Sequence, residues 1–160
     1  MKLRLFLVLA VSLLPVLACE SEVREANVNQ DKNIDTYING NYAENAVYHN
    51  GGSSRVVLME GPQGAPVIEK GDSVYLYYAG YTFGQRGPET CFVVDSGMVR
   101  VGAGDLIRGL EEGLPGARQG EEALIIFSAD DGYGSQPVGL VPANTALLFD
   151  VGVALIKKNP

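Results

Sequence analysis

The hydrophobic and polar residues of the chain form blocks that predict several strands around one helix. Residues 73–83 (SVYLYYAGYTF) are a long β-type run with aromatic residues at both odd and even positions, so both faces of this strand are expected to be covered. Because the strand-like runs do not alternate with helices in βαβ units, the pattern favours an antiparallel α+β domain. Further runs of this kind occupy residues 91–102 (with an interruption at residues 95–97), 121–129 and 146–156.

One segment has the apolar spacing and the terminal residues of a helix. It spans residues 103–117 (AGDLIRGLEEGLPGA), and Asp105 is placed to act as an N-terminal cap or first-turn anion. Its apolar stripe consists of Leu106, Ile107, Leu110 and Leu114, and Gly113, Pro115 and Gly116 are expected to end it. The strands are expected to surround this helix.

A shorter helix and a hairpin are predicted before the first long strand. The helix has Asn33 as a candidate cap, and its apolar stripe consists of Ile34, Tyr37, Ile38 and Tyr42. A tyrosine-bearing stripe at helical spacing is typical of a docking face. A strong hairpin signal, Asn50-Gly51-Gly52, follows between two β-rich runs, and the lone His49 beside it is interpreted as an exposed strand residue.

The first residues have the pattern of a secretory signal. Residues 1–18 combine a basic start with an apolar run that is short for a membrane span, and a buried N-terminal helix is the alternative. Val16-Leu17-Ala18-Cys19 resembles the lipobox of bacterial lipoproteins, in which Cys19 would be lipidated. An ordinary cleavage site beside an incidental cysteine is the alternative there. A polar, flexible tether is expected over residues 19–33.

Charge and the reactive residues narrow the functional classes. The formal net charge is −7, and cleavage would make it −9 because Lys2 and Arg4 leave without an acidic residue. An acidic surface without a basic cluster argues against binding nucleic acid. No metal-ligand cluster, phosphate loop or nucleophile elbow is visible, so neither metal nor cofactor is expected. Cys91 is expected to be half-buried and unreactive, and the adjacent Asp130 and Asp131 to be solvated.

Three motifs, taken in their order along the chain, resemble the FKBP-type peptidyl-prolyl isomerases. They are GDSVYLYYAGYTF (71–83, with Tyr78-Ala79-Gly80), VGAGDLIRGLEEGLPGARQGE (101–121) and DGYGSQPVGLVPANTALLFDVGV (131–153). The resemblance implies an FKBP-like α+β fold, in which a five- or six-stranded antiparallel sheet wraps around the central helix. The isomerase domain would span residues 71–157, preceded by a helix-and-hairpin extension at 34–70.

The same resemblance implies a pocket between the helix and the sheet. Catalytic roles are implied for Tyr78, Phe92, Tyr133 and Phe149. Substrate binding is implied for Asp95, Leu106, Ile107, Leu110, Leu140 and Val141, the last two from an apolar loop that would form the pocket rim. The family usually has an aspartate directly after the phenylalanine, whereas Val93 follows Phe92 here. Either Asp95 takes this role from a shifted register, or the role is lost.

The implied function is peptidyl-prolyl cis-trans isomerisation that assists the folding of exported proteins. X–Pro bonds exchange in roughly tens to hundreds of seconds, and a site that favours the twisted imide needs no nucleophile, metal or cofactor. The implied partners are proline-containing polypeptide segments and a membrane reached through lipid on Cys19, which would place the protein in the bacterial cell envelope, at the outer membrane. A non-catalytic FKBP-like binding or chaperone module is one alternative, and a structural surface lipoprotein is another.

Overall fold

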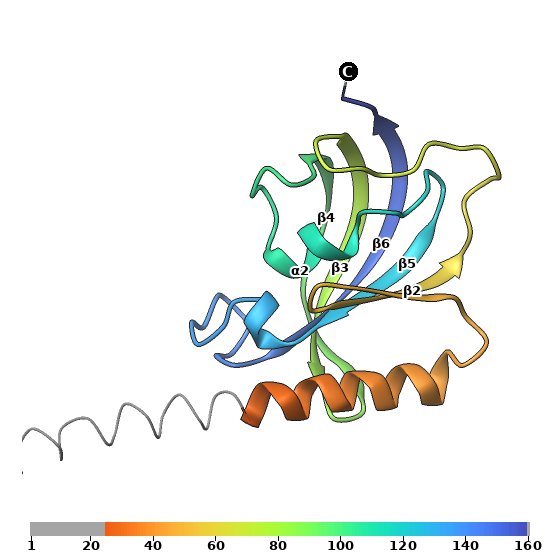
Figure 1. Cartoon of the computed structure of the whole chain (residues 1–160). Coiled ribbons are helices and arrows are strands. Elements are labelled where there is room, and N and C mark those ends of the chain that lie inside the picture. The colour runs from red at the N-terminus through yellow and green to blue at the C-terminus, as the bar shows by residue number, and fades with distance from the viewer. Residues whose placement is uncertain (1–24, 160) are drawn as a thin grey trace, which may run out of the picture.

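Six antiparallel strands curve around a short central helix (Figure 1). The computed structural model describes residues 25–159, so the predicted signal peptide, Cys19 and the first residues of the predicted tether lie outside the described residues. The strand order across the sheet is β1-β2-β5-β6-β3-β4, which confirms the predicted α+β class and antiparallel sheet. The elements are β1 Val47–Asn50, β2 Ser53–Met59, β3 Ser73–Gly84, β4 Gly87–Arg100, α2 Arg108–Gly113, β5 Glu122–Phe127, η1 Ala129–Asp131 and β6 Ala146–Lys157.

Consecutive residues of the central strands enter two different cores. Leu147 and Phe149 of β6 are buried with Leu110 of α2, whereas Leu148 is buried in a separate cluster with Val56 of β2. Side chains of a strand point alternately to the two faces of the sheet. A continuous apolar run is therefore expected wherever both faces are covered. The unbroken apolar sequences of β5 and β6 follow from this double burial.

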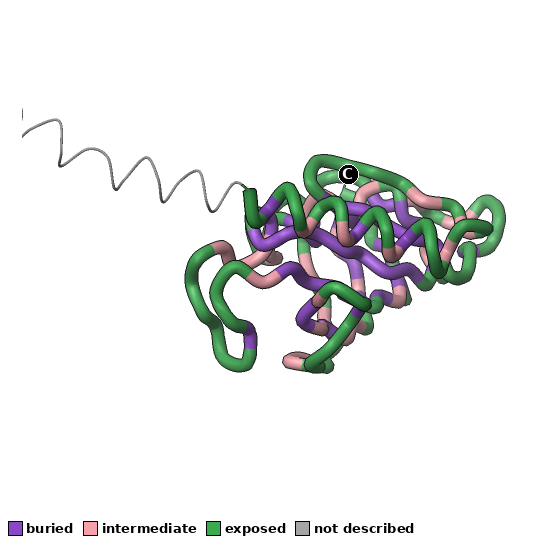
Figure 2. The backbone as a smooth tube through the Cα atoms, turned by 90° about the horizontal axis from the view of Figure 1, so that it is seen from below, coloured by how far each residue is buried: buried purple, intermediate pink, exposed green. Residues whose placement is uncertain are grey.

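The second core lies under an N-terminal helix, whose described part spans residues 25–41 (Figures 1 and 2). Ile34 and Ile38 are buried there, 3% and 4% exposed. Tyr37 packs edge-on against Phe83, with ring centroids 5.2 Å apart. The predicted docking stripe therefore packs on the sheet of its own chain. The structural-lipoprotein alternative loses its only support, because that support was the tyrosine stripe.

This helix is longer than its apolar pattern indicates. Residues 25–33 are helical, although they belong to the predicted flexible tether, and Asn33 lies inside the helix rather than capping its start. The prediction was wrong because the segment docks through polar groups. Asn27 is buried, and the side-chain amide of Gln30 makes two hydrogen bonds to the domain. Such contacts leave no apolar periodicity in the sequence.

The predicted hairpin forms, and it completes the sheet. Asn50 pairs with Ser53 across the turn, and Gly51 adopts a φ of 57°. β2 then pairs with β5, so residues 47–59 are part of the same sheet as the later strands. His49 is exposed on β1, as expected, and its Nδ1 lies 3.0 Å from the hydroxyl oxygen of Ser54.

Three predictions for β3 and β4 need correction. β4 continues without interruption through residues 95–97, because each of them is paired to β3 in the ladder. Tyr77 is 58% exposed, so the face of β3 opposite α2 is covered along only part of its length. Cys91 is exposed rather than half-buried.

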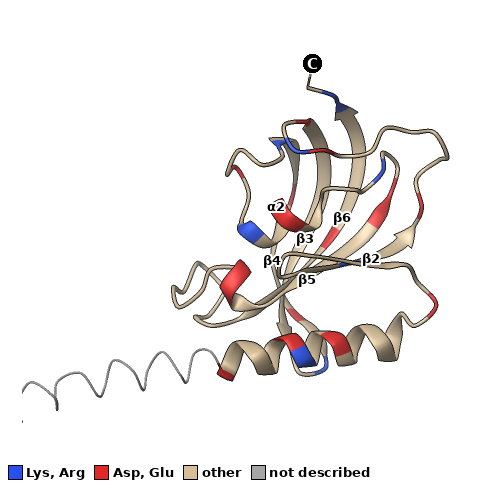
Figure 3. Ribbon diagram, in the orientation of Figure 1, with Lys and Arg blue, Asp and Glu red and all other residues tan. Residues whose placement is uncertain are grey.

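Charged side chains lie mostly at the surface, and acidic ones gather on the N-terminal helix, α2 and η1 (Figure 3). A buried exception joins Arg55 of β2 to Glu121, whose side chains are 4% and 7% exposed. Pairing is what makes such burial tolerable, because a lone buried charge is costly. Between residues 25 and 159, no helix combines the length and the apolar character needed to cross a bilayer.

Candidate functional site

A cavity of about 380 Å³ opens between α2 and the sheet. A pocket of this size fits a small, mainly apolar group that makes few polar contacts. The lining residues are Tyr78, Phe92, Val93, Asp105, Leu106, Ile107, Leu110, Tyr133, Val138, Gly139, Leu140 and Phe149. The structure thus brings together all of the residues predicted for the pocket except Asp95 and Val141.

Phe149 lies at the centre of the aromatic wall. Its ring is 5.7 Å from Phe92 with the planes 86° apart, and 6.3 Å from Tyr78. Phe127 stacks on it at 5.9 Å, and Tyr133 meets Phe92 edge-on at 6.4 Å. Edge-on and offset contacts are the arrangements that aromatic rings prefer. The rings therefore hold one another in place, and Phe149 itself is only 3% exposed.

Gly80 of β3 allows this wall to form. It pairs with Val93 on one side and with Phe149 on the other. A Cβ atom at Gly80 would lie 2.7 Å from Cγ1 of Val93, 2.8 Å from Cε1 of Phe149 and 2.8 Å from Cζ of Phe92. The two rings occupy the space that a side chain would need. A packing requirement therefore explains the glycine of the Tyr78-Ala79-Gly80 motif.

A β-bulge turns two consecutive residues of β4 toward the cavity. Gly80 pairs with Val93 and Tyr81 with Cys91, which leaves Phe92 without a partner on β3. Regular strands alternate their side chains, whereas a bulge disturbs this alternation. Val93 thus lines the cavity next to Phe92, at the position where the family resemblance implies an aspartate. A bulge of this kind cannot be predicted from the two-residue alternation of a strand.

Asp95, the candidate replacement for that aspartate, does not line this cavity. It is exposed, and it lines a separate cavity with Tyr77 and Asp150. In the ladder it lies opposite Tyr78, which lines both cavities. Burial and the neighbouring Asp95 carboxylate together raise the pKa of Tyr78, so this phenol stays protonated well into the alkaline range.

Helix α2 lies close to β5 because two of its glycines face the sheet. A Cβ atom at Gly109 would be 2.3 Å from Cγ of Phe127, and one at Gly113 would be 2.4 Å from Cγ2 of Ile125. Larger residues would push the helix away from the sheet and open the base of the cavity. Leu110, between the two glycines, is 4% exposed and lines the cavity.

Glu111 holds the segment that precedes α2. Its carboxylate accepts hydrogen bonds from the backbone N–H groups of Gly102, Gly104 and Leu106. Hydrogen bonds to an ionised acceptor are stronger than neutral ones. This single side chain therefore fixes the turn that presents Leu106 and Ile107 to the cavity.

The prediction that Asp105 caps the helix or lies in its first turn was wrong. α2 begins at Arg108, after Ile107, and has no side-chain cap. The carboxylate of Asp105 instead accepts a hydrogen bond of 3.3 Å from the backbone N–H of Arg100. Asp105 lies at the edge of the cavity, where it contributes the one charged side chain among the described lining residues.

Residues 132–145 form the rim of the cavity, and we call them the rim loop. Val138 and Leu140 are 44% and 67% exposed, an unusual exposure for apolar residues beside a pocket. Val138 and Val141 exchange two backbone hydrogen bonds of 2.9 Å, which close a tight turn around Gly139. Val141 is 1% exposed and packs in the core. It supports the loop. The prediction that Val141 lines the cavity was wrong, because the turn directs its side chain into the core.

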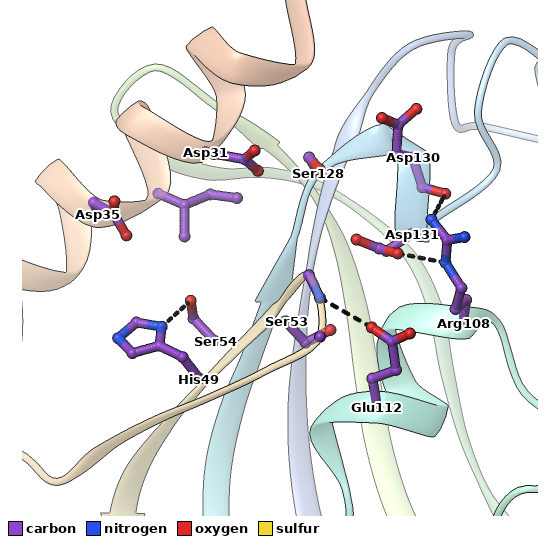
Figure 4. Close-up of a pocket in the computed structure, with 13 residues that line it drawn as sticks. Asp31, Asp35, His49, Ser53, Ser54, Arg108, Glu112, Ser128, Asp130 and Asp131 are labelled. Atoms are coloured by element: carbon purple, nitrogen blue, oxygen red, sulfur yellow. Dashed lines mark hydrogen bonds and ion pairs between the residues drawn. The ribbon is translucent and has the colours of Figure 1, made fainter. Parts of the chain in front are cut away.

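A second, larger cavity of about 500 Å³ lies between the N-terminal helix, the β1–β2 turn, α2 and η1 (Figure 4). Asp131 is buried there and paired with Arg108, so the prediction that it is solvated was wrong. Burial raises the pKa of Asp31, and nearby carboxylates add to this. No three His, Cys, Asp or Glu residues of the described chain are arranged to hold a metal ion. None of the predicted site residues lines this cavity, so the first one is the candidate site.

Comparison with known proteins agrees with this choice. The profile of the family described as FKBP-type peptidyl-prolyl cis-trans isomerase matches residues 65–154. FK506-binding protein 1 of Yarrowia lipolytica is 38% identical over 98 residues, which cover 60% of this chain and 91% of that protein. A peptidyl-prolyl cis-trans isomerase of Schizosaccharomyces pombe is 36% identical over 110 residues, 66% of this chain and 95% of that protein.

A solved structure shows the same fold. The crystal structure of the three FKBP domains of wheat FKBP73 superimposes with a TM-score of 0.64 at 22% identity, covering 72% of this chain and 52% of that chain. The family profile includes every lining residue of the first cavity, whereas the N-terminal helix and the β1–β2 hairpin precede it. Since the profile covers more than half of the sequence, the chain belongs to the FKBP-type peptidyl-prolyl cis-trans isomerase family.

Proposed function

We propose that this peptidyl-prolyl cis-trans isomerase binds the X–Pro bond of its substrate in the cavity between α2 and the sheet. The observation that carries the proposal is the convergence of four aromatic side chains and Ile107 around one hollow. The aromatic residues are Tyr78, Phe92, Tyr133 and Phe149. They come from β3, β4, the rim loop and β6, so only the folded domain creates this surface.

An apolar cavity suits this reaction for a physical reason. Rotation about a peptide bond has a barrier of roughly 18–20 kcal/mol, because resonance is lost in the twisted state. The planar imide is more polar than the twisted one, so transfer from water into an apolar site costs the planar ground state more. Each ~1.4 kcal/mol of this difference accelerates the exchange about tenfold. Such catalysis requires a shaped, dry surface and no covalent step.

The lining residues take different roles in this proposal. Phe92 and Phe149 form a wall against which a proline ring packs. Tyr133 is half-buried at the rim, where its hydroxyl can donate a hydrogen bond to a carbonyl oxygen of the substrate. The exposed Leu140 contacts the chain that flanks the proline.

An isomerisation assay on a proline-containing tetrapeptide tests the proposal. Tyr133→Phe removes one hydrogen bond but keeps the ring, and we expect kcat/KM to fall about threefold to tenfold, as for a net loss of about 1 kcal/mol. Phe149→Ala removes the centre of the wall and should reduce kcat/KM further. Exchange at the uncatalysed rate with folded wild-type protein would refute the proposal.

A second candidate is a non-catalytic module that binds proline-containing segments. It is favoured by one observation, the presence of Val93 at the cavity position where the family resemblance implies an aspartate. The two candidates differ in one measurable respect. A binding module would retain the peptide and show saturable shifts of the cavity residues while cis-trans exchange continued at the solution rate.

We also propose that lipid on Cys19 anchors the protein in the bacterial envelope, at the outer membrane, where it would assist the folding of exported proteins. The support is the sequence Val16-Leu17-Ala18-Cys19 after a signal-like segment. Cys19→Ala should abolish labelling with radioactive fatty acid and release a soluble, active domain. Wild-type protein that carries no label and fractionates as soluble would refute the anchor without affecting the isomerase proposal.

A further inference from the structure

Gln30 of the N-terminal helix contacts both ends of the rim loop. Its side-chain oxygen accepts a hydrogen bond of 2.8 Å from the backbone N–H of Ala129, just before the loop. Its side-chain nitrogen donates a hydrogen bond of 2.7 Å to the carbonyl oxygen of Asn144, near the end of the loop. One amide side chain therefore connects two backbone positions that are 15 residues apart in the sequence. The amide suits this position because it supplies a donor and an acceptor at once.

The same two ends are also hydrogen-bonded through Gly134. The backbone N–H of Gly134 donates to the carbonyl oxygen of Ala129 at 2.8 Å, and the N–H of Asn144 donates to the carbonyl oxygen of Gly134 at 2.7 Å. Asn144 has a φ of 55°, a left-handed conformation that is uncommon for residues other than glycine. A position of this kind needs support from its surroundings. Gln30 supplies such support directly at the Asn144 carbonyl.

The beginning of the loop is held from two sides. Arg108 of α2 pairs with Asp131 and donates a hydrogen bond of 2.9 Å to the carbonyl oxygen of Asp130 (Figure 4). On the other side, the side-chain oxygen of Gln30 accepts the hydrogen bond from the backbone N–H of Ala129. Tyr133 follows this clamped turn directly and lines the cavity. The turn that precedes Tyr133 is therefore held in part by a helix that lies outside the family profile.

We infer that Gln30 is a positioning residue for the isomerase cavity, through which the N-terminal helix fixes the rim loop that carries Tyr133 and Leu140. The inference rests on the proposed function insofar as the rim loop contacts substrate. It assigns the N-terminal helix a role in activity in addition to its packing on the sheet.

Two variants of Gln30 and one control test the inference. Gln30→Met fills a similar volume but removes both hydrogen bonds. Gln30→Glu keeps an acceptor for Ala129 and, while ionised, lacks the donor for Asn144; once protonated, the carboxylic acid supplies both again. Asn29→Ala is the control, because Asn29 is the exposed neighbour on the same helix. Nuclear magnetic resonance exchange spectroscopy on a proline peptide reads activity at every pH without a coupling enzyme.

For Gln30→Met we expect kcat/KM to fall about threefold to tenfold, from the net loss of two hydrogen bonds. Hydrogen exchange of the Gly134 and Asn144 amides should accelerate, while amides of β5 and β6 keep their protection. Gln30→Glu should resemble Gln30→Met at neutral pH and recover toward wild type as the pH falls below about 5. Wild type is measured at each pH as a reference, because other groups that line the adjoining cavity can also change charge. These groups are Asp31, Asp35, Asp130, Asp131, Glu112 and His49, and the positively charged Arg108 lies among them.

Each outcome decides the question. Unchanged activity and unchanged amide exchange in Gln30→Met would overturn the inference, as would a loss of protection spread evenly over the whole domain, which would indicate a structural role only. If wild type proves inactive, the proposed function fails, yet exchange of the Gly134 and Asn144 amides still decides whether Gln30 positions the loop. Asn29→Ala should match wild type in both measurements.

Discussion

Replacing Gly80 by alanine tests how the cavity wall is built. The new Cβ atom would lie 2.7–2.8 Å from Val93, Phe149 and Phe92, and all three are side chains of the cavity lining. Carbon atoms pack at about 3.5–4.0 Å, so the surrounding atoms must retreat by up to about an ångström. Phe149 cannot retreat freely, because Phe127 stacks against its ring. The aromatic wall should therefore shift toward the cavity.

The expected cost follows from this geometry. Overpacking by one methyl group in a well-packed core costs about 1–3 kcal/mol. A domain of this size loses roughly 3–6 °C of Tm per kcal/mol, so calorimetry should show a clear decrease. Because the displaced rings form the proposed substrate wall, kcat/KM for a proline tetrapeptide should fall at least about tenfold at temperatures where the variant remains folded.

Gly97→Ala provides a matched control. It makes the same substitution on the adjacent strand β4, and an added Cβ atom would have no neighbour within 4 Å. Glycine in a strand costs about 0.5–1 kcal/mol relative to alanine, so this variant should be equally stable or slightly more stable, with wild-type activity. If Gly80→Ala were as stable and as active as Gly97→Ala, the reasoning about the aromatic wall would be refuted.

Three further predictions concern titration and reactivity. Burial acts to raise the pKa of Asp72, but hydrogen bonds from Lys158 and two backbone N–H groups outweigh it and lower the pKa below the ordinary value of 3.8. The resulting stabilisation is complete above that pH and is lost as the pH falls through the folded-state pKa. Urea unfolding should therefore show that Asp72→Asn is less stable than wild type at pH 7 and loses less stability on acidification to pH 3, and an unchanged acid profile would contradict this. Asp95→Asn should lower the pKa of Tyr78 only partway toward its ordinary value, because burial is the larger cause of the rise; an ultraviolet titration of the phenolate checks this, and an unchanged pKa would be contrary evidence. The exposed Cys91 should react with a thiol reagent in the native protein without loss of isomerase activity, and a thiol that reacts only after unfolding would disprove its exposure.

The sequence predicts the cavity well where aromatic and apolar residues occupy motif positions. Tyr78, Phe92, Tyr133 and Phe149 line one cavity, as the resemblance of their motifs to the family implied. The lining role of Val93 could not be predicted, since it depends on a bulge that breaks the two-residue period of the strand.

Two other errors have different causes. Val141 lies next to Leu140 in an apolar loop, and only the tight turn between residues 138 and 141 decides which of them faces the cavity. The segment before Ile34 resembles a tether because its docking residues are polar. The hydrogen bonds of Gln30 depend on partners about 100 residues away in sequence, which no local pattern reveals.

The most direct test of the central claim is a titration of isotope-labelled protein with a proline tetrapeptide, in which cis-trans exchange and the shifts of assigned protein resonances are recorded together. We predict accelerated exchange, accompanied by shifts at Tyr78, Ile107, Tyr133 and Leu140 around the first cavity. Accelerated exchange with shifts confined to the acidic cavity around Asp31 would contradict the proposed site, and no acceleration would contradict the isomerase mechanism itself.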